Sequence, residues 1–329
     1  HVMALIDQAD MGTPMETIQL ADTGQLISRV AMGGCPLGGH GWGHVDDSKS
    51  IAAVRRALDL GVNFFDTADV YGLGHSERIL ARALGAKRHE VVIATKFGIR
   101  HENGRTWKDA SPAYLRSALE ASLRRLQMDC IPLYYLHWPD EETPLVETMA
   151  ELARCRQEGK IRWIGLSNFS APQVREATAV MPVEAMQVQF SLVDRLKAAE
   201  LLPLAQQLGI TLLTWGSLAQ GLLTGKYDAQ ATFAPQDRRS HYDNFLGDKF
   251  SQNLRAVERL REVAALVDKK PAQVALRWLL DTPGIGGVLF GAKQPAQVDE
   301  NVGAAGWRLP AREYETLKTL EILFMEALA

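Results

Sequence analysis

Cysteine, net charge and long apolar runs are all scarce in this sequence of 329 residues. The three cysteines, Cys35, Cys130 and Cys155, fit no metal-ligand spacing and no disulfide framework, so a reducing compartment is expected. A formal net charge of −3 gives no electrostatic reason for binding nucleic acid or an anionic membrane surface. No apolar run approaches the ~20 residues of a membrane span. These absences predict a soluble, cytoplasmic protein without nucleic-acid, membrane or metal partners.

The N-terminal segment lacks the charged and apolar regions of a signal peptide. His1 and Val2 precede Met3, which is typical of residues added during cloning. We expect residues 1–16 to be disordered or artificially added, and residues 17–329 to form a single domain. The hydrophobic fraction of 47% is enough for one large core, and single-domain α/β barrels reach this length.

Short β-type runs alternate with helical patterns through most of the chain. Strands that alternate with helices indicate a parallel sheet, and eight such units indicate closure into a (β/α)8 TIM barrel, an α/β fold. The expected strands are Val30–Gly33, Val62–Asp66, Val91–Lys96, Ile131–His137, Trp163–Ser167, Ala185–Gln189, Thr211–Trp215 and Gly287–Gly291.

The segments between these strands carry helical periodicity and signals for helix ends. Serines precede three of the helices as expected N-caps, and glycines follow three of them where a left-handed C-cap is favoured. The expected helices include Ser48–Leu60, Ser76–Leu84, Pro112–Leu126, Leu145–Glu158 and Ala171–Ala179, with Ser48, Ser111 and Ser170 as N-caps and Gly61, Gly159 and Gly209 at the C-terminal ends.

Other segments lie outside the repeat. Thr17–Leu20 and Leu26–Arg29 flank a turn-rich spacer, which predicts an N-terminal β-hairpin that plugs the bottom of the barrel. Thr232–Asp248 is long for a connection after a barrel strand, which indicates a functional loop. Ala311–Met325 predicts a C-terminal helix on the outside of the barrel.

Four polar residues stand at or just beyond the ends of expected strands. Asp66, Lys96 and His137 each close a buried strand, and Tyr71 follows Asp66 in a short turn. A barrel of parallel strands places its chemistry at the carboxyl ends of the strands, so we expect these side chains to meet at one mouth. A phenol, an ammonium, a carboxylate and an imidazole together can deliver a proton to a carbonyl oxygen.

Tyr71 is the candidate general acid of this group. A Lys96 ammonium near the phenol is expected to lower its pKa, while Asp66 keeps Lys96 charged and His137 orients the carbonyl. Each residue alone also has a structural explanation: a strand end for Asp66, an amphipathic surface position for Tyr71 and a satisfied core histidine for His137. Lys96 resists such an explanation, because a buried lysine must be paired or shift its pKa. The four together favour catalysis.

Four runs around these positions, residues 63–72, 136–140, 165–169 and 187–190, resemble the aldo-keto reductase superfamily in order and spacing. The similarity extends over nearly the whole chain, and residues 221–227 resemble the branch of long-loop bacterial reductases and potassium-channel β-subunits. The resemblance implies a (β/α)8 barrel that binds NADPH across its C-terminal mouth. It implies hydride transfer to the carbonyl of an aldehyde, ketone or keto-sugar, with catalytic residues Asp66, Tyr71, Lys96 and His137.

The resemblance also implies a set of cofactor contacts. Ser167, Asn168 and Gln189 match residues that hydrogen-bond the nicotinamide carboxamide, and Trp215 matches the aromatic residue that stacks on the ring. The glycine-bearing segment that follows is expected at the pyrophosphate, and the last βα loop at the 2′-phosphate and adenine, with Lys293 as the phosphate partner. The remaining implied contacts are Gly216, Ser217, Leu218, Gly221, Gly225, Lys226, Gly291, Gln297, Glu300 and Asn301.

Four positions depart from the family pattern, and one of them is Phe290, which replaces a common proline before the phosphate loop. Cys35 stands where many relatives have a bulky aromatic residue in the substrate pocket, and no proline follows Ser217. Gln297 stands where some relatives have an arginine that clamps the 2′-phosphate, which weakens the case for NADPH over NADH. Lys293 keeps NADPH as the favoured cofactor.

Other functions are compatible with the same residues. An NADPH-sensing binding subunit would show negligible turnover, and an NAD-linked sugar or alcohol dehydrogenase would use the same barrel. A metal-dependent hydrolase is disfavoured, because His137 has no further ligand residue at a suitable spacing. The favoured reading is an NADPH-dependent reductase whose partner is a small-molecule carbonyl compound.

Overall fold

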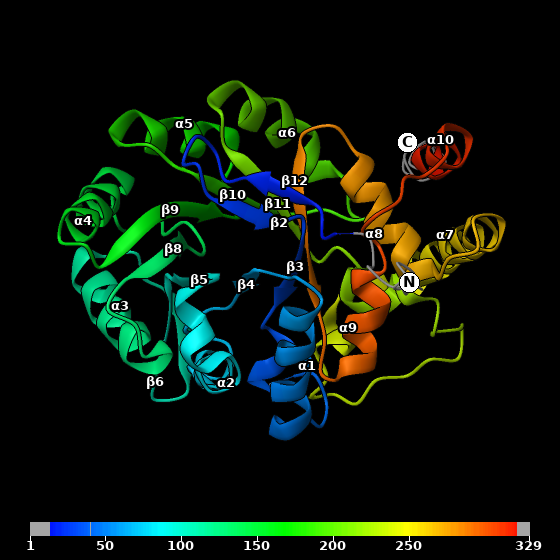
Figure 1. The fold of residues 1–329 in the computed structure, drawn as a ribbon, viewed down its shortest axis with the longest axis horizontal. Coiled ribbons are helices and arrows are strands. Elements are labelled where there is room, and N and C mark those ends of the chain that lie inside the picture. The colour runs from blue at the N-terminus through cyan, green and yellow to red at the C-terminus, as the bar shows by residue number, and fades with distance from the viewer. Residues whose placement is uncertain (1–13, 40, 321–329) are drawn as a thin grey trace, which may run out of the picture.

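Eight parallel strands form a closed ring at the centre of the molecule, with helices around it (Figure 1). The computed structural model describes residues 14–39 and 41–320. The order of strands around the ring follows the chain, and the last strand pairs with the first. The expected (β/α)8 barrel is therefore confirmed. Residues 1–13 of the segment expected to be disordered or added lie outside the described part, as does the end of the expected helix Ala311–Met325.

The barrel strands agree with the expected ones to within two residues at each end. Their bounds are β3 (Val30–Gly33), β4 (Phe64–Asp66), β5 (Val92–Phe97), β8 (Ile131–Leu136), β9 (Ile161–Ser167), β10 (Ala185–Gln189), β11 (Thr211–Trp215) and β12 (Ile285–Gly291).

The outer layer consists of helices that connect successive strands. Ser111 and Ser170 begin helices as expected, but the expected cap Ser48 is wrong. The extended residue Asp46 caps that helix instead, accepting the N–H of Lys49 at 2.9 Å. The bounds are α1 (Asp47–Asp59), α2 (His75–Leu84), α3 (Pro112–Leu126), α4 (Leu145–Gln157), α5 (Ala171–Val180), α6 (Leu196–Leu208), α7 (Gly247–Leu266), α8 (Pro271–Asp281), α9 (Pro295–Val302) and α10 (Ala311–Lys318).

Successive residues along each barrel strand alternate between two apolar layers. In β4, Phe64 belongs to the cluster inside the barrel, whereas Phe65 belongs to the core between strands and helices. Ala94 in β5 also lies in the inner cluster. Because side chains on a strand alternate with a period of two, Asp66 and Lys96 continue the inward rows at the ends of these strands.

The N-terminal hairpin closes the bottom of the barrel, as expected. Its strands β1 (Thr17–Gln19) and β2 (Leu26–Ser28) pair antiparallel. Leu20 and Ile27 are fully buried in the inner cluster. Asn63, which directly precedes β4, fastens the hairpin because its Oδ1 accepts a backbone N–H of β2 at 2.6 Å.

A second hairpin projects from the loop between β5 and α3. Its strands are β6 (Ile99–Glu102) and β7 (Arg105–Lys108), which are not among the expected strands. The turn consists of Asn103 and Gly104, both with positive φ (51° and 76°). Asn-Gly is the preferred sequence for a two-residue hairpin turn, so the sequence contained a signal for this element.

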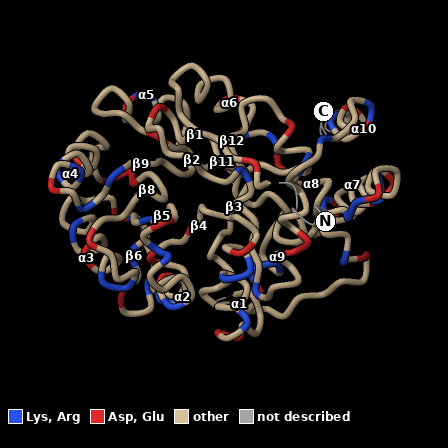
Figure 2. The backbone as a smooth tube through the Cα atoms, viewed as in Figure 1, with Lys and Arg blue, Asp and Glu red and all other residues tan. Residues whose placement is uncertain are grey.

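Charged residues of both signs are interspersed along the outer helices and loops, in keeping with the small net charge (Figure 2). Within the described residues, no helix is both long and apolar enough to cross a bilayer.

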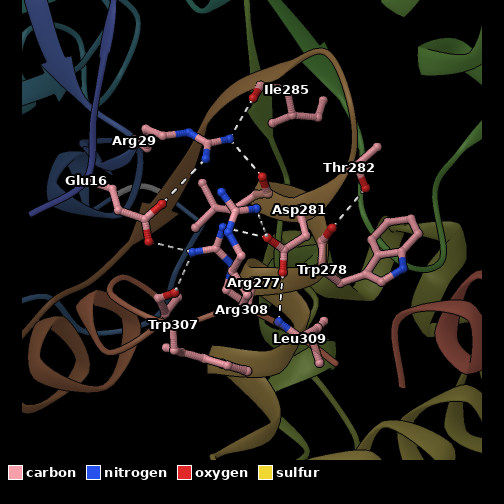
Figure 3. Close-up of polar contacts among 12 residues, drawn as sticks. Glu16, Arg29, Arg277, Trp278, Asp281, Thr282, Ile285, Trp307, Arg308 and Leu309 are labelled. Atoms are coloured by element: carbon pink, nitrogen blue, oxygen red, sulfur yellow. Dashed lines mark hydrogen bonds and ion pairs between the residues drawn. The ribbon is translucent and has the colours of Figure 1, made fainter. Parts of the chain in front are cut away.

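A network of ion pairs connects the start of the chain to α8. Figure 3 shows Glu16 between Arg29 and Arg277, with Asp281 between Arg277 and Arg308. Arg277 is fully buried, and its guanidinium reaches Glu16 at 2.7 Å and Asp281 at 2.9 Å. Distant parts of the chain therefore depend on one buried cation.

Candidate active site

A buried ion pair joins the ends of β4 and β5. The Nζ of Lys96 donates to the Asp66 carboxylate and, at 2.9 Å, to the carbonyl oxygen of Thr67. Lys96 is 1% exposed and Asp66 3% exposed. Burial raises the pKa of Asp66, and the charge and hydrogen bond of Lys96 oppose that effect.

Gln187 is a member of this group that sequence reasoning missed. Its Nε2 donates to the second oxygen of Asp66 at 2.5 Å, so both carboxylate oxygens are engaged. Gln187 lies two residues after Ala185 in β10, which belongs to the inner cluster. Gln187 is a polar residue among the inward-facing positions of its strand, and this pattern could have identified it from the sequence.

Tyr71 lies beside this ion pair, in the turn after β4. The Nζ of Lys96 is 5.2 Å from the centre of the Tyr71 ring. We expected Lys96 to lower the pKa of the phenol, and that expectation is wrong. Burial raises the pKa of Tyr71 well above its ordinary value, and Cys35 and Asp66 raise it further. The physical reason is that burial takes the phenol out of water, which disfavours the charged phenolate more than the nearby cations favour it. Tyr71 is held protonated, as a hydrogen-bond donor.

His137 follows β8 and faces Tyr71. Their rings meet edge to face, with centroids 5.8 Å apart and an interplanar angle of 83°. Burial lowers the pKa of His137 well below its ordinary value, and the charges of Lys96 and Arg238 add to the effect. The imidazole is therefore neutral. Its Nδ1 is buried without a hydrogen-bond partner among the described residues.

The residues expected at the nicotinamide lie on the next three strand ends. Ser167 ends β9, Gln189 ends β10 and Trp215 ends β11. The Nδ2 of Asn168 donates to the carbonyl oxygen of His137 at 3.0 Å, which connects this group to the catalytic candidates. Within the described part of the chain, Asn168 Oδ1 and Trp215 Nε1 are buried without a partner. An amide oxygen and an indole N–H without partners could hydrogen-bond a carboxamide, and the indole ring could stack on the aromatic ring that carries it.

The glycine-bearing segment expected at the pyrophosphate follows β11. The kinked 3-10 helix η3 (Ala219–Thr224) begins after Leu218 and contains Gly221, and Gly225 directly follows it. The Nζ of Lys226 lies over the Tyr227 ring, 5.0 Å from its centre. Gly216 and Ser217 precede the helix, and the Ser217 hydroxyl is occupied by a hydrogen bond with Thr214 at 2.9 Å.

Lys293 lies near other cations at the end of β12. Burial lowers the pKa of Lys293, and the charges of Arg239 and Lys226 lower it further. Its Nζ donates to the carbonyl oxygen of Trp42 at 2.8 Å. Gln297 accepts the backbone N–H of Lys293 at 2.8 Å, so it stabilises this turn. The cluster of cations suits a phosphate group.

The last implied contacts lie on β12 and α9. Gly291 ends β12, where an added Cβ would lie 2.8 Å from Pro36. Asn301 is buried on α9, but the Glu300 carboxylate is engaged elsewhere, in an ion pair with Lys270 at 2.9 Å. Glu300 is thus the implied contact that the structure does not join to the others.

The arrangement brings a protonated phenol, a neutral imidazole and a buried ion pair to one mouth of the barrel, beside polar atoms without partners. Such a site can bind a carbonyl oxygen with two donors and supply it with a proton. Across the residues described, no group of three or more His, Cys, Asp or Glu side chains could hold a metal ion.

Comparisons with known proteins agree on one family. A model of the aldo/keto reductase family matches residues 29–322. The chain is 38% identical to the aldo-keto reductase YhdN of Bacillus subtilis over 309 residues, which cover 93% of each protein. It is 32% identical to the probable aldo-keto reductase 1 of Glycine max, over 91% of this chain and 87% of that one.

Solved structures give the same result. The glycerol dehydrogenase AKR11B4 from Gluconobacter oxydans is 36% identical, with a TM-score of 0.86 over 92% of this chain and 94% of that one. The aldo-keto reductase AKR11C1 from Bacillus halodurans, solved in its holo form, is 29% identical, with a TM-score of 0.77 over 93% of this chain and 96% of that one.

Proposed function

The chain belongs to the aldo/keto reductase family of oxidoreductases, and from that membership we propose that it reduces the carbonyl of an aldehyde, ketone or keto-sugar with NADPH. In this proposal Tyr71 is the general acid and His137 positions the carbonyl oxygen. The observation that carries the proposal is the Asp66–Lys96 ion pair beside a half-buried, protonated Tyr71 that faces a neutral His137.

The residues divide the proton chemistry among them. Tyr71 donates its proton to the carbonyl oxygen, and the phenolate that remains lies near the Lys96 ammonium, which stabilises it. Asp66 and Gln187 hold Lys96 in place through the two carboxylate oxygens. His137, being neutral, hydrogen-bonds the same oxygen without competing as an acid. When bound, the reduced nicotinamide cofactor supplies the hydride that adds to the carbonyl carbon.

Three cations support NADPH as the cofactor. Burial lowers the pKa of Lys293, the charges of Arg239 and Lys226 lower it further, and Asp237, which pairs with Arg239, opposes them in part. A phosphate placed among the three cations would relieve their mutual repulsion. Gln297, in contrast, contributes no charge. The unpartnered Trp215 and Asn168 atoms suit the nicotinamide end, so the chain has fitting groups for both ends of the cofactor.

Replacing Tyr71 by Phe tests the proposal. We expect Tyr71→Phe to lower kcat by about 10²- to 10⁴-fold, the usual contribution of a positioned acid, with the NADPH Kd nearly unchanged. Steady-state rates and a fluorescence titration with NADPH and NADH, read through quenching of Trp215, measure both quantities. Turnover retained by the variant would refute Tyr71 as the acid, and equal affinity for the two cofactors would refute the preference for NADPH.

The reverse reaction is a second candidate, favoured by the similarity to a glycerol dehydrogenase. The same assay run with NADP+ and glycerol distinguishes the directions. A kcat/KM for glycerol above those for all carbonyl substrates would make polyol oxidation the main activity. Tyr71 would then act as the base that accepts the alcohol proton.

A further inference from the structure

Arg238 lies at the same mouth of the barrel, although it is distant in sequence from Tyr71 and His137. It belongs to the loop after β11, in the short 3-10 helix η4 (Arg238–His241). Its backbone N–H donates to the carbonyl oxygen of Gly41 at 3.0 Å. Its side chain packs so closely on that residue that a Cβ at position 41 would lie 2.6 Å from Arg238 Cγ. The stem of the arginine is therefore held in place.

The guanidinium of Arg238 reaches the wall of the pocket beside Tyr71. One terminal nitrogen lies 3.9 Å from the Sγ of Cys35. The residues after Cys35 pack on the Tyr71 turn, where a Cβ at Gly38 would lie 2.6 Å from the Tyr71 carbonyl carbon. The small Cys35 side chain thus leaves room for the arginine on the side of the Tyr71 turn.

Arg238 differs from its neighbour Arg239 in having no anionic partner. Arg239 binds Asp237 through two nitrogens, at 2.8 Å and 2.5 Å. Over residues 14–39 and 41–320, no carboxylate pairs with Arg238, and its polar contacts are the Cys35 thiol and the Tyr242 hydroxyl. The thiol and the hydroxyl are both neutral. They compensate only weakly for the charge of a half-buried guanidinium that has five N–H donors.

When the charges of the four catalytic candidates are added, they cancel, and Arg238 remains as the uncompensated positive charge beside them. Asp66 and Lys96 compensate each other, and Tyr71 and His137 are neutral. Burial lowers the pKa of His137, and the charges of Lys96 and Arg238 lower it further. A half-buried cation without an anionic partner attracts an anionic ligand.

We propose that Arg238 selects carbonyl substrates that carry an anionic group, a carboxylate or a phosphate, a few bonds away from the reacting carbonyl. This inference rests on the proposed reductase function and deepens it. Cys35 provides the space, and the guanidinium provides a two-pronged donor that matches the geometry of either anion. Arg238 is a specificity residue here and takes no part in proton transfer.

Matched substrates that differ only in charge test the proposal. One pair is 4-oxobutanoate and its methyl ester, and the other is glyceraldehyde 3-phosphate and glyceraldehyde, so the two pairs distinguish carboxylate from phosphate. The variants are Arg238→Gln and Arg238→Lys, with Arg312→Gln on the exposed side of α10 as control. Thermal unfolding and the NADPH Kd are measured for every variant.

We expect the wild type to prefer the anionic member of at least one pair. Arg238→Gln should lower kcat/KM for that member by about 10- to 100-fold, mainly through KM, as for a lost hydrogen bond to a charged group. The neutral member, the NADPH Kd and the control should change by less than about threefold, and Arg238→Lys should retain part of the preference. The preference of the wild type should also fall as NaCl is raised, a measurement that requires no variant.

Several outcomes would overturn the inference while leaving the reductase function intact. They are equal loss for both members of a pair, a weaker NADPH Kd that accounts for the loss, or wild-type turnover of the neutral members without preference for the anionic ones. Absence of turnover with any carbonyl and either cofactor would instead overturn the proposed function itself.

Discussion

Three carboxylates near the candidate active site differ in their partners, and two of them, Asp66 and Glu77, are buried. Asp66 is paired with Lys96, and Glu77 is paired with Arg125. Asp69 lies between them in sequence and has no cation of its own among the described residues. The Tyr114 hydroxyl donates to Asp69 Oδ2 at 3.3 Å. Asp69 Oδ1 has no hydrogen-bond partner among the described residues. Burial and the charge of Glu77 raise the pKa of Asp69 to about 8.

Asp69 should therefore make stability depend on pH. Between about pH 4 and pH 8 the unfolded chain loses this proton while the folded protein keeps it, so stability falls as pH rises through that window. Asp69→Asn resembles the protonated acid and should remove this part of the fall, raising Tm by about 2 °C or more at pH 8 with little effect near pH 4.

Thermal unfolding of wild type and Asp69→Asn from pH 4 to pH 9 measures the difference. Asp22→Asn, an exposed aspartate in the N-terminal hairpin turn, is the matched control. Parallel pH profiles for wild type and Asp69→Asn would show that Asp69 is ionised in the folded protein.

At the scale of elements, the strands were predictable because each is a short, largely apolar run between helical patterns. Side chains alternate along a strand with a period of two, so the pattern that buries Phe64 inside the barrel also directs Asp66 inward. The site residues at the strand ends could therefore be predicted from this pattern. Gln187 follows this rule and could have been found. Arg238 could not, because a long loop without periodicity brings it to the site. The burial of the Tyr71 phenol, which reverses the expected shift of its pKa, could not be predicted either, because it depends on tertiary packing.

Packing between neighbouring strands inside the barrel leaves little tolerance at Gly165 in β9. A Cβ there would lie 2.3 Å from Cε1 of Tyr135, a fully buried ring in β8. We expect Gly165→Ala to cost about 1–3 kcal/mol of unfolding free energy, because the ring must leave its place. At Gly33 the nearest atom to an added Cβ is 3.5 Å away, so Gly33→Ala should be tolerated. Urea unfolding of both variants measures the costs, and equal costs would contradict the packing argument.

At the scale of the whole molecule, one buried arginine holds segments from both ends of the chain. Arg277 binds Glu16 before β1 and Asp281 at the end of α8, and Glu16 also accepts the N–H of Gly306 after α9 at 2.8 Å. Arg308 binds the same Asp281 from solvent, with its side chain 77% exposed. The two arginines share a partner and differ in burial, which makes them a matched pair.

Removing the buried member of this pair should be far more costly. Arg277→Met leaves Glu16 and Asp281 without their buried cation and should lower the unfolding free energy by about 3–5 kcal/mol. Arg308→Gln should cost about 1 kcal/mol or less, as for an exposed pair. Chemical denaturation of the two variants gives both values. Similar losses would mean that burial of Arg277 carries no special cost.

The pairing of β12 with β3 has a consequence for synthesis of the protein. The ring closes only when Ile285–Gly291 has left the ribosome, long after Val30–Gly33. At ~5–20 residues per second, β3 presents an open strand edge for on the order of ten to fifty seconds. An open apolar edge is a template for pairing with another nascent chain. Yield in the cell should therefore depend on chaperones that shield the growing chain, even though the finished ring has no free edge.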